Sequence, residues 1–77
     1  MEKFAIIEIG SISTGCLYCE GKVWDTINIS IIDNKTKLIT RGVFTMRQDD
    51  GGRYIDFTKT KFKTLGIIYL VELRMAV

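Results

Sequence analysis

Two cysteines three positions apart are the most reactive feature of the sequence. Cys16-Leu17-Tyr18-Cys19 has the spacing of half a zinc knuckle, but tetrahedral zinc needs four ligands, and the chain has no histidine and no third cysteine. Zinc would need carboxylates or two thiol pairs joined across a dimer. A redox dithiol is the other alternative, although such pairs usually precede a helix in a βαβ unit, which is not predicted here. We expect a structural or unliganded pair, with Cys16 and Cys19 as the only metal candidates, and no cofactor.

Basic residues gather in one half of the chain. Residues 35–63 carry eight lysines and arginines against three aspartates, whereas residues 1–34 carry two lysines against five acidic residues. The basic half can present a positive face to an acidic partner, unless interleaved strands mix the charges in space. Nucleic-acid-binding proteins combine a basic groove with aromatic rings on which bases stack. The candidate binding residues are Trp24, Lys37, Arg41, Arg47, Arg53, Tyr54, Lys59, Lys61 and Lys63.

Trp24 is the best stacking candidate, because the alternation of residues 23–32 puts it on the polar face of a strand. The segment 10–22 would remove it from solvent if it folded over this face. Tyr54 belongs to a run that superficially resembles an aromatic RNA-binding strand, but Asp56 shares its face and would repel phosphate. An ordinary solvated surface is therefore the favoured interpretation of the basic residues.

The residue types that most enzymes use are missing. There is no histidine for general base catalysis and no glycine-rich loop leading into a helix for binding phosphate. Asp49 and Asp50 are adjacent carboxylates, but they precede two glycines and are typical turn formers. The sequence therefore predicts a protein that is not an enzyme.

The elements that position these residues are predicted to be strands. The chain has only two alanines and no proline and is rich in isoleucine and threonine, which favours β-structure. Gly42 is expected to form a bulge, 10–22 to form a loop that folds back as a lid, and a short helical turn is expected near 59–65, ended by Gly66. Alternation and turn residues predict strands at 4–9, 23–32, 37–46, 53–57 and 65–75.

Five strands in meander order predict an all-β fold, a small five-stranded antiparallel barrel or rolled sheet of the SH3-like or OB-like kind. The length predicts a single β domain over residues 1–77. The run 65–75 is the most apolar, so we expect it to be a core strand, with the strand at 4–9 beside it. Such an architecture implies no particular function.

The sequence predicts a small non-catalytic binding protein that acts by protein–protein contact. An unprotected terminal strand could augment a partner's sheet, as in an inhibitor or adaptor of the kind that phages and other mobile elements encode. The alternative is a nucleic-acid-binding small β-barrel that uses the basic surface of residues 35–63. The apolar fraction of 47% leads us to expect a homo-oligomer. No run is long enough to span a membrane and no signal peptide is recognised, which predicts a cytoplasmic protein without a membrane partner.

Overall fold

The computed structural model describes residues 2–19 and 21–76, with side chains described for residues 2–15 and 21–73. Five antiparallel strands form a sheet in the order β1-β2-β3-β4-β5. The predicted all-β five-stranded antiparallel fold is confirmed. The sheet does not close, so a rolled sheet describes it better than a barrel. The elements are β1 (Phe4–Cys19), β2 (Lys22–Asp33), β3 (Ile39–Asp49), β4 (Gly52–Asp56), the 3₁₀ turn η1 (Lys63–Leu65), β5 (Ile67–Tyr69) and α1 (Leu70–Ala76).

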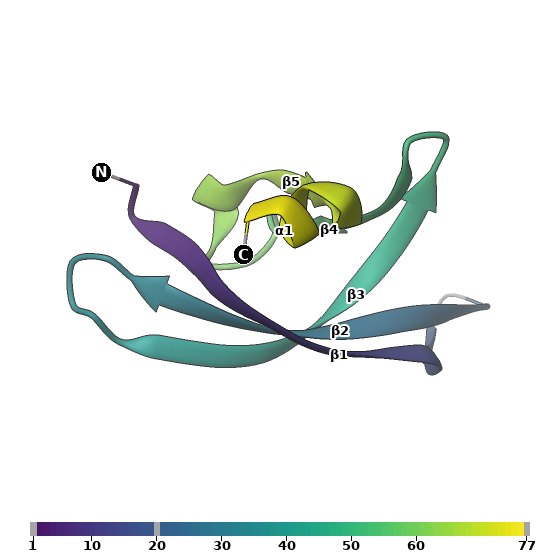
Figure 1. The fold of residues 1–77 in the computed structure, drawn as a ribbon. Coiled ribbons are helices and arrows are strands. Elements are labelled where there is room, and N and C mark those ends of the chain that lie inside the picture. The colour runs from purple at the N-terminus through teal and green to yellow at the C-terminus, as the bar shows by residue number, and fades with distance from the viewer. Residues whose placement is uncertain (1, 20, 77) are drawn as a thin grey trace.

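The strands are arranged in two layers that share β3. Strands β1, β2 and β3 form a long curved ribbon, and β4, β5 and α1 lie over its concave side (Figure 1). The first part of β3, Ile39–Met46, pairs with β2, and the last part, Arg47–Asp49, pairs with β4. We call the unit formed by β4, η1, β5 and α1 the second layer. Because β3 belongs to both layers, its course decides where the second layer sits.

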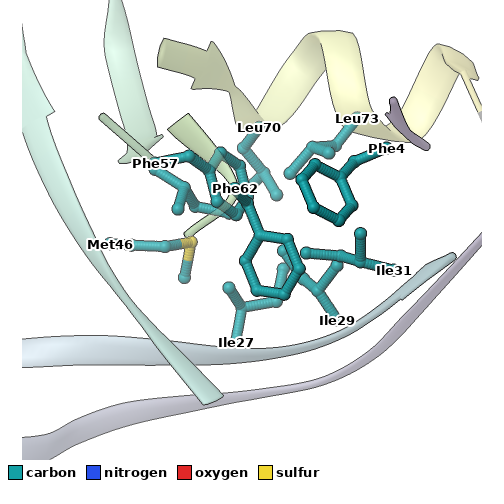
Figure 2. Packing of buried hydrophobic residues seen from close by; sticks show 10 residues of the cluster. Phe4, Ile27, Ile29, Ile31, Met46, Phe57, Phe62, Leu70 and Leu73 are labelled. Atoms are coloured by element: carbon teal, nitrogen blue, oxygen red, sulfur yellow. The ribbon is translucent and has the colours of Figure 1, made fainter. Parts of the chain in front are cut away.

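The core lies between the ribbon and the second layer. Ile27, Ile29 and Ile31 on β2 are at most 1% exposed, which confirms the predicted alternation for these residues. Figure 2 shows them below aromatic and leucine side chains of the second layer. The alternation of residues 23–32 also predicts that Val23 lies on this buried face, and this prediction is wrong. Val23 is 60% exposed because it lies near the end of the β1–β2 hairpin, which extends beyond the second layer (Figure 1).

A tight reversal after β4 brings two aromatic rings into the core. Phe57 and Phe62 are buried, and the hydroxyl of Thr60 joins them by donating to the Phe57 carbonyl and accepting the Phe62 N–H. The predicted helical turn is confirmed as η1, and it ends at Gly66, whose φ of 70° and ψ of −142° favour glycine. The turn leaves three lysines in solvent: Lys59, Lys61 and Lys63.

The expectation of a loop at 10–22 was wrong. β1 continues to Cys19 and pairs with β2, with register shifts between Ile6 and Glu8, between Ile9 and Ile12, and further along the strand. Glycine and hydroxyl residues are typical of loops, but glycine also serves at β-bulges, where the strand bends and the backbones approach closely. At Gly10, for example, an added Cβ would lie 3.0 Å from the Cβ of Asn28. The glycine and hydroxyl residues that predicted a loop therefore belong to a bulged strand.

The bulges keep one row of side chains on the core face. Ile6, Ile9 and Ile12 are three positions apart on β1, and they pair with Ile31, Ile29 and Ile27, which are two positions apart on β2. Regular pairing at this spacing would send every second isoleucine of β1 to the opposite face. One extra residue per step restores the phase, and each such insertion bends and twists the ribbon.

The expectation of a long strand at 65–75 was also wrong. Only Ile67–Tyr69 is extended, and α1 follows from Leu70. Leu70 and Leu73 are buried while Val71 is 63% exposed, which is the spacing of a helix with one apolar face. β5 pairs with β4, so the first strand does not lie hydrogen-bonded beside the last, contrary to expectation. The β-branched residues Ile67 and Ile68 favour a strand, and this is why a strand was predicted for the whole run.

Gly42 does not form the predicted bulge. The β2–β3 register runs without a shift through the pair Ile29 and Gly42. The ring of Phe44 lies over this position, where an added Cβ would be 3.0 Å from Phe44 Cε2. Glycine at 42 therefore makes room for an aromatic ring that packs against Phe57, with ring centroids 5.1 Å apart.

Two aspartates stabilise turns, one between β2 and β3 and the other directly after β4. Asp33 accepts hydrogen bonds from the backbone N–H groups of Lys35 (2.9 Å) and Thr36 (3.3 Å), and these bonds lower its pKa below its ordinary value. Asp56 accepts from the hydroxyl and the backbone N–H of Thr58, which lower the pKa of Asp56 in the same way. The Asp-Gly hairpin turn predicted after β3 is confirmed, because Asp49 pairs with Gly52 across it.

These two carboxylates make stability sensitive to acid. Their folded pKa values lie below the ordinary value of 3.8, so their contribution is complete above that pH and is lost as pH falls through the lowered values. We expect the urea midpoint of the double variant Asp33→Asn with Asp56→Asn to fall less between neutral pH and strong acid than that of the wild type. Asp50→Asn, in an exposed turn, is the control. Equal acid dependence in all three proteins would contradict the assignment.

The row of buried isoleucines on β2 is expected to make a large contribution to the free energy of unfolding. Replacing Ile29 with alanine removes a side chain that is 1% exposed and leaves a cavity, which should cost about 2–5 kcal/mol in the free energy of unfolding measured with urea. Val43→Ala is the matched control, because Val43 lies on the next strand and is 65% exposed, and it should cost less than about 0.5 kcal/mol. Equal losses in the free energy of unfolding for Ile29→Ala and Val43→Ala would contradict a core on the face that carries Ile29.

Candidate functional site

The unclosed side of the sheet contains an apolar groove, which we call the seam. It lies between the start of β1 and the second layer, with a volume of about 300 Å³. Figure 1 shows this part of β1 passing close to α1 and β5. Two acidic residues, Glu2 and Glu72, also line it. Its apolar lining consists of Phe4, Ala5, Ile6, Leu65, Ile68 and Leu73.

Side chains, rather than a strand ladder, hold the two sides of the seam together. The rings of Phe4 and Phe62 meet edge to face with centroids 5.0 Å apart. In the described part of the chain, β1 pairs with β2 alone. The other edge of β1 therefore has no strand beside it, and an unpaired edge is a template for adding a strand. Ile7, at the first bulge of this edge strand, is 43% exposed.

The charges at the seam have one sign. Glu2 and Glu72 are exposed and are the only charged residues that line the groove in the described structure. Lys3 does not line the groove: it borders neighbouring depressions, one with Asp33 and Lys61 and one with Glu2, and its ammonium group lies 5.3 Å from the centroid of the Phe4 ring. A segment bound in the seam would therefore meet two acidic residues, Glu2 just before β1 and Glu72 on α1.

Three of the predicted binding residues meet in a second feature, the aromatic strip. It consists of Trp24, Arg47, Tyr54 and Tyr69 from β2, β3, β4 and β5. The Arg47 guanidinium lies 4.9 Å from the centroid of the Trp24 ring, which favours a cation–π interaction. Arg47 pairs across the strands with Tyr54, whose ring centroid is 5.4 Å from that of Tyr69. Tyr69 was not among the predicted binding residues, because it belongs to the run 65–75 that was predicted to be a buried core strand.

Carboxylates accompany the aromatic strip. The Tyr69 hydroxyl donates to Asp49 at 2.7 Å, and the Arg53 guanidinium donates to Asp25 at 3.2 Å. Asp56 lies close enough to Arg47 for the arginine's charge to help lower the pKa of Asp56. Negative charge beside the rings disfavours a phosphate backbone on this surface. Arg53, a predicted binding residue, is thus paired within the protein.

The remaining basic candidates lie elsewhere. Arg41 is on the outer face of the ribbon, 4.0 Å from the Glu8 carboxylate, with both side chains largely exposed. Lys61 lines the depression that also includes residues on both sides of Lys37 in the β2–β3 turn. This end of the ribbon is nine residues along β2 from Trp24, roughly 30 Å at the rise of a strand. Lys37 and Lys61 therefore lie at the end of the ribbon opposite to the aromatic strip. Lys59 and Lys63 are exposed near η1.

The structure does not test the cysteine pair. Cys16 and Cys19 lie at the end of β1, and their side chains are outside the described part of the structure. Among the side chains that are described, no three potential ligands of the types histidine, cysteine, aspartate and glutamate come together. The prediction of a structural or unliganded pair, with Cys16 and Cys19 as the only metal candidates, therefore stays a prediction.

Comparisons with protein-family models, with curated proteins and with solved structures found no match for this chain. Within the described residues, no helix has the length and apolar character needed to cross a membrane. The function must therefore be argued from the seam and the aromatic strip themselves.

The hydrogen bond between Tyr69 and Asp49 can be tested by titration. It raises the pKa of Tyr69 above the ordinary value of 10.0, because the bond and the negative charge of Asp49 both favour the protonated phenol. We expect Asp49→Asn to lower the pKa of Tyr69, measured by NMR of labelled tyrosine rings, whereas Asp50→Asn should change it less. The raised pKa stabilises the fold below the ordinary value, and this contribution is lost as pH rises through the raised value. A Tyr69 pKa that is unchanged in Asp49→Asn would contradict the bond.

Proposed function

We propose that the protein is a non-catalytic binding module that recognises another protein by accepting an extended segment at the seam. One observation carries this proposal: the free edge of β1 lies beside an apolar groove that the fold does not fill. A segment added to a sheet edge gains affinity from main-chain hydrogen bonds and specificity from pockets that receive alternate side chains. The seam supplies both elements.

The dimensions of the seam suit a short strand. The stretch Phe4–Ile9 of β1 is six residues long, which corresponds to roughly 20 Å of extended chain. Ile6, Leu65 and Ile68 are only partly buried while they pack against the core, so an apolar side chain placed in the groove would bury them further. An inhibitor or adaptor role follows from this mode of binding, because a captured segment is withdrawn from its other partners.

The alternative, a nucleic-acid-binding protein, requires cations and stacking rings in one groove. Here the rings of the aromatic strip lie beside Asp49 and Asp56, and Lys61 borders the depression at the opposite end of the ribbon, next to the β2–β3 turn that carries Lys35 and Lys37. The half-buried rings and these lysines would thus have to act separately. We therefore keep nucleic acid as an outcome of the test and argue for a protein partner.

The proposal predicts that a charge on the β1 edge weakens partner binding. Ile7→Lys places a lysine on this edge strand, where lysine opposes strand addition, and should lower affinity for the partner by about tenfold or more. Val43→Lys is the matched control, since Val43 is also exposed and β-branched but lies on β3, at the opposite edge of the ribbon, and does not line the seam. Partners are captured from source cells with each bait, with and without nuclease, and then titrated individually by calorimetry.

Three results decide between the functions. A nuclease-resistant partner whose affinity falls in Ile7→Lys but not in Val43→Lys supports strand capture at the seam. Equal affinity for wild type and Ile7→Lys contradicts it. Capture that disappears with nuclease and declines steeply between 50 and 200 mM salt, by about a thousandfold for six or more phosphate contacts, favours nucleic acid instead.

A further inference from the structure

We infer that the segment accepted at the seam is a strand that combines apolar side chains with lysine or arginine. This inference rests on the proposed function and specifies the chemistry of the partner. The free edge and the groove call for an extended chain with alternating apolar side chains. Its charge is set by Glu2 and Glu72, which line the same groove, one just before β1 and the other on α1.

The two carboxylates come from different elements. Glu2 precedes β1, and its backbone carbonyl accepts a hydrogen bond from the side chain of Asn34 at 2.7 Å, which holds this end of the chain against the β2–β3 turn. Glu72 is on α1, one residue before Leu73, which is 1% exposed and anchors the helix in the core. Both carboxylates are therefore attached to fixed backbone, and both are exposed to an incoming segment. Opposite charge at such positions steers a segment and sets its register more than it adds affinity.

A second copy of this chain that paired through its own β1 would be a poorer occupant. β1 has a single charged residue, Glu8, which is acidic. Pairing β1 with its own copy would therefore bring a carboxylate, and no cation from the strand, toward Glu2 and Glu72. Like charges on opposed strands are destabilising. Lys3 of the copy, just before the strand, packs over its own Phe4 ring.

The test uses two synthetic peptides and the full chain. In both peptides valine and threonine alternate over five positions, and the ends carry two lysines in one peptide and two glutamates in the other. Binding is followed by NMR shifts of backbone amides at low salt. We expect the lysine peptide to move amides of residues 4–9 and 65–73 and to bind about threefold to tenfold more tightly than the glutamate peptide, with the difference reduced at high salt.

Charge reversal provides the matched comparison. In Glu2→Lys with Glu72→Lys, the preference should reverse in favour of the glutamate peptide. The control, Asp50→Lys with Val43→Lys and Gln48→Lys, has the same change in net charge at exposed residues that neither line the groove nor lie on β1, and it should keep the preference for lysine. Because all the replaced side chains are exposed, both variants are expected to fold, and their amide spectra check this directly.

The outcomes separate this inference from the proposed function. If both peptides bind with equal affinity and move the same amides, the inferred basic residues of the partner segment are wrong, while strand capture at the seam stands. If neither peptide moves the β1 amides at millimolar concentration, strand capture and its charge rule are both overturned. If the β1 amides move with protein concentration in the absence of peptide, a second copy occupies the seam, and the inferred partner chemistry is wrong.

Discussion

A mismatch of spacing between two strands shapes the whole molecule. The isoleucines of β1 recur every three residues, those of β2 every two, and both rows must face the same core. The only way to satisfy both is to insert an extra residue in β1 at each step, and each insertion bends and twists the pair. The resulting ribbon is curved enough for β4, β5 and α1 to lie on its concave side (Figure 1).

The same constraint explains why the sheet stays open. Closing it would require β1 to pair regularly with β5, but β5 has only three residues before the chain turns into α1. Leu70 and Leu73 direct the helix into the core, and burial of these leucines replaces the area that a continued strand would have covered. Phe4 then reaches Phe62 with its ring, so side-chain packing closes the core while the backbone edge stays free.

Local signals in the sequence were sufficient for much of the fold. The buried row Ile27, Ile29 and Ile31 in β2, the Asp-Gly turn after β3 and the reversal ended by Gly66 are each encoded within a few residues, and all were predicted correctly. The bulged half of β1 could not be recognised alone, because spacing by three becomes meaningful only against β2. The aromatic strip needed the register of four strands to bring Tyr69 beside Tyr54. The seam depends on which strands fail to pair, and no local pattern encodes that.

An open edge must be either protected or used, because its unpaired backbone groups otherwise invite aggregation. The chain has no proline to block pairing. Its protection is uneven: β1 has two register shifts between Ile9 and Leu17, whereas the stretch Phe4–Ile9 has one. Bulges disrupt the ladder that an added strand would need, so the far part of β1 is the poorer template. The more regular part of this edge is the part that borders the apolar groove, which is where a binding strand would find both hydrogen bonds and a place for its side chains.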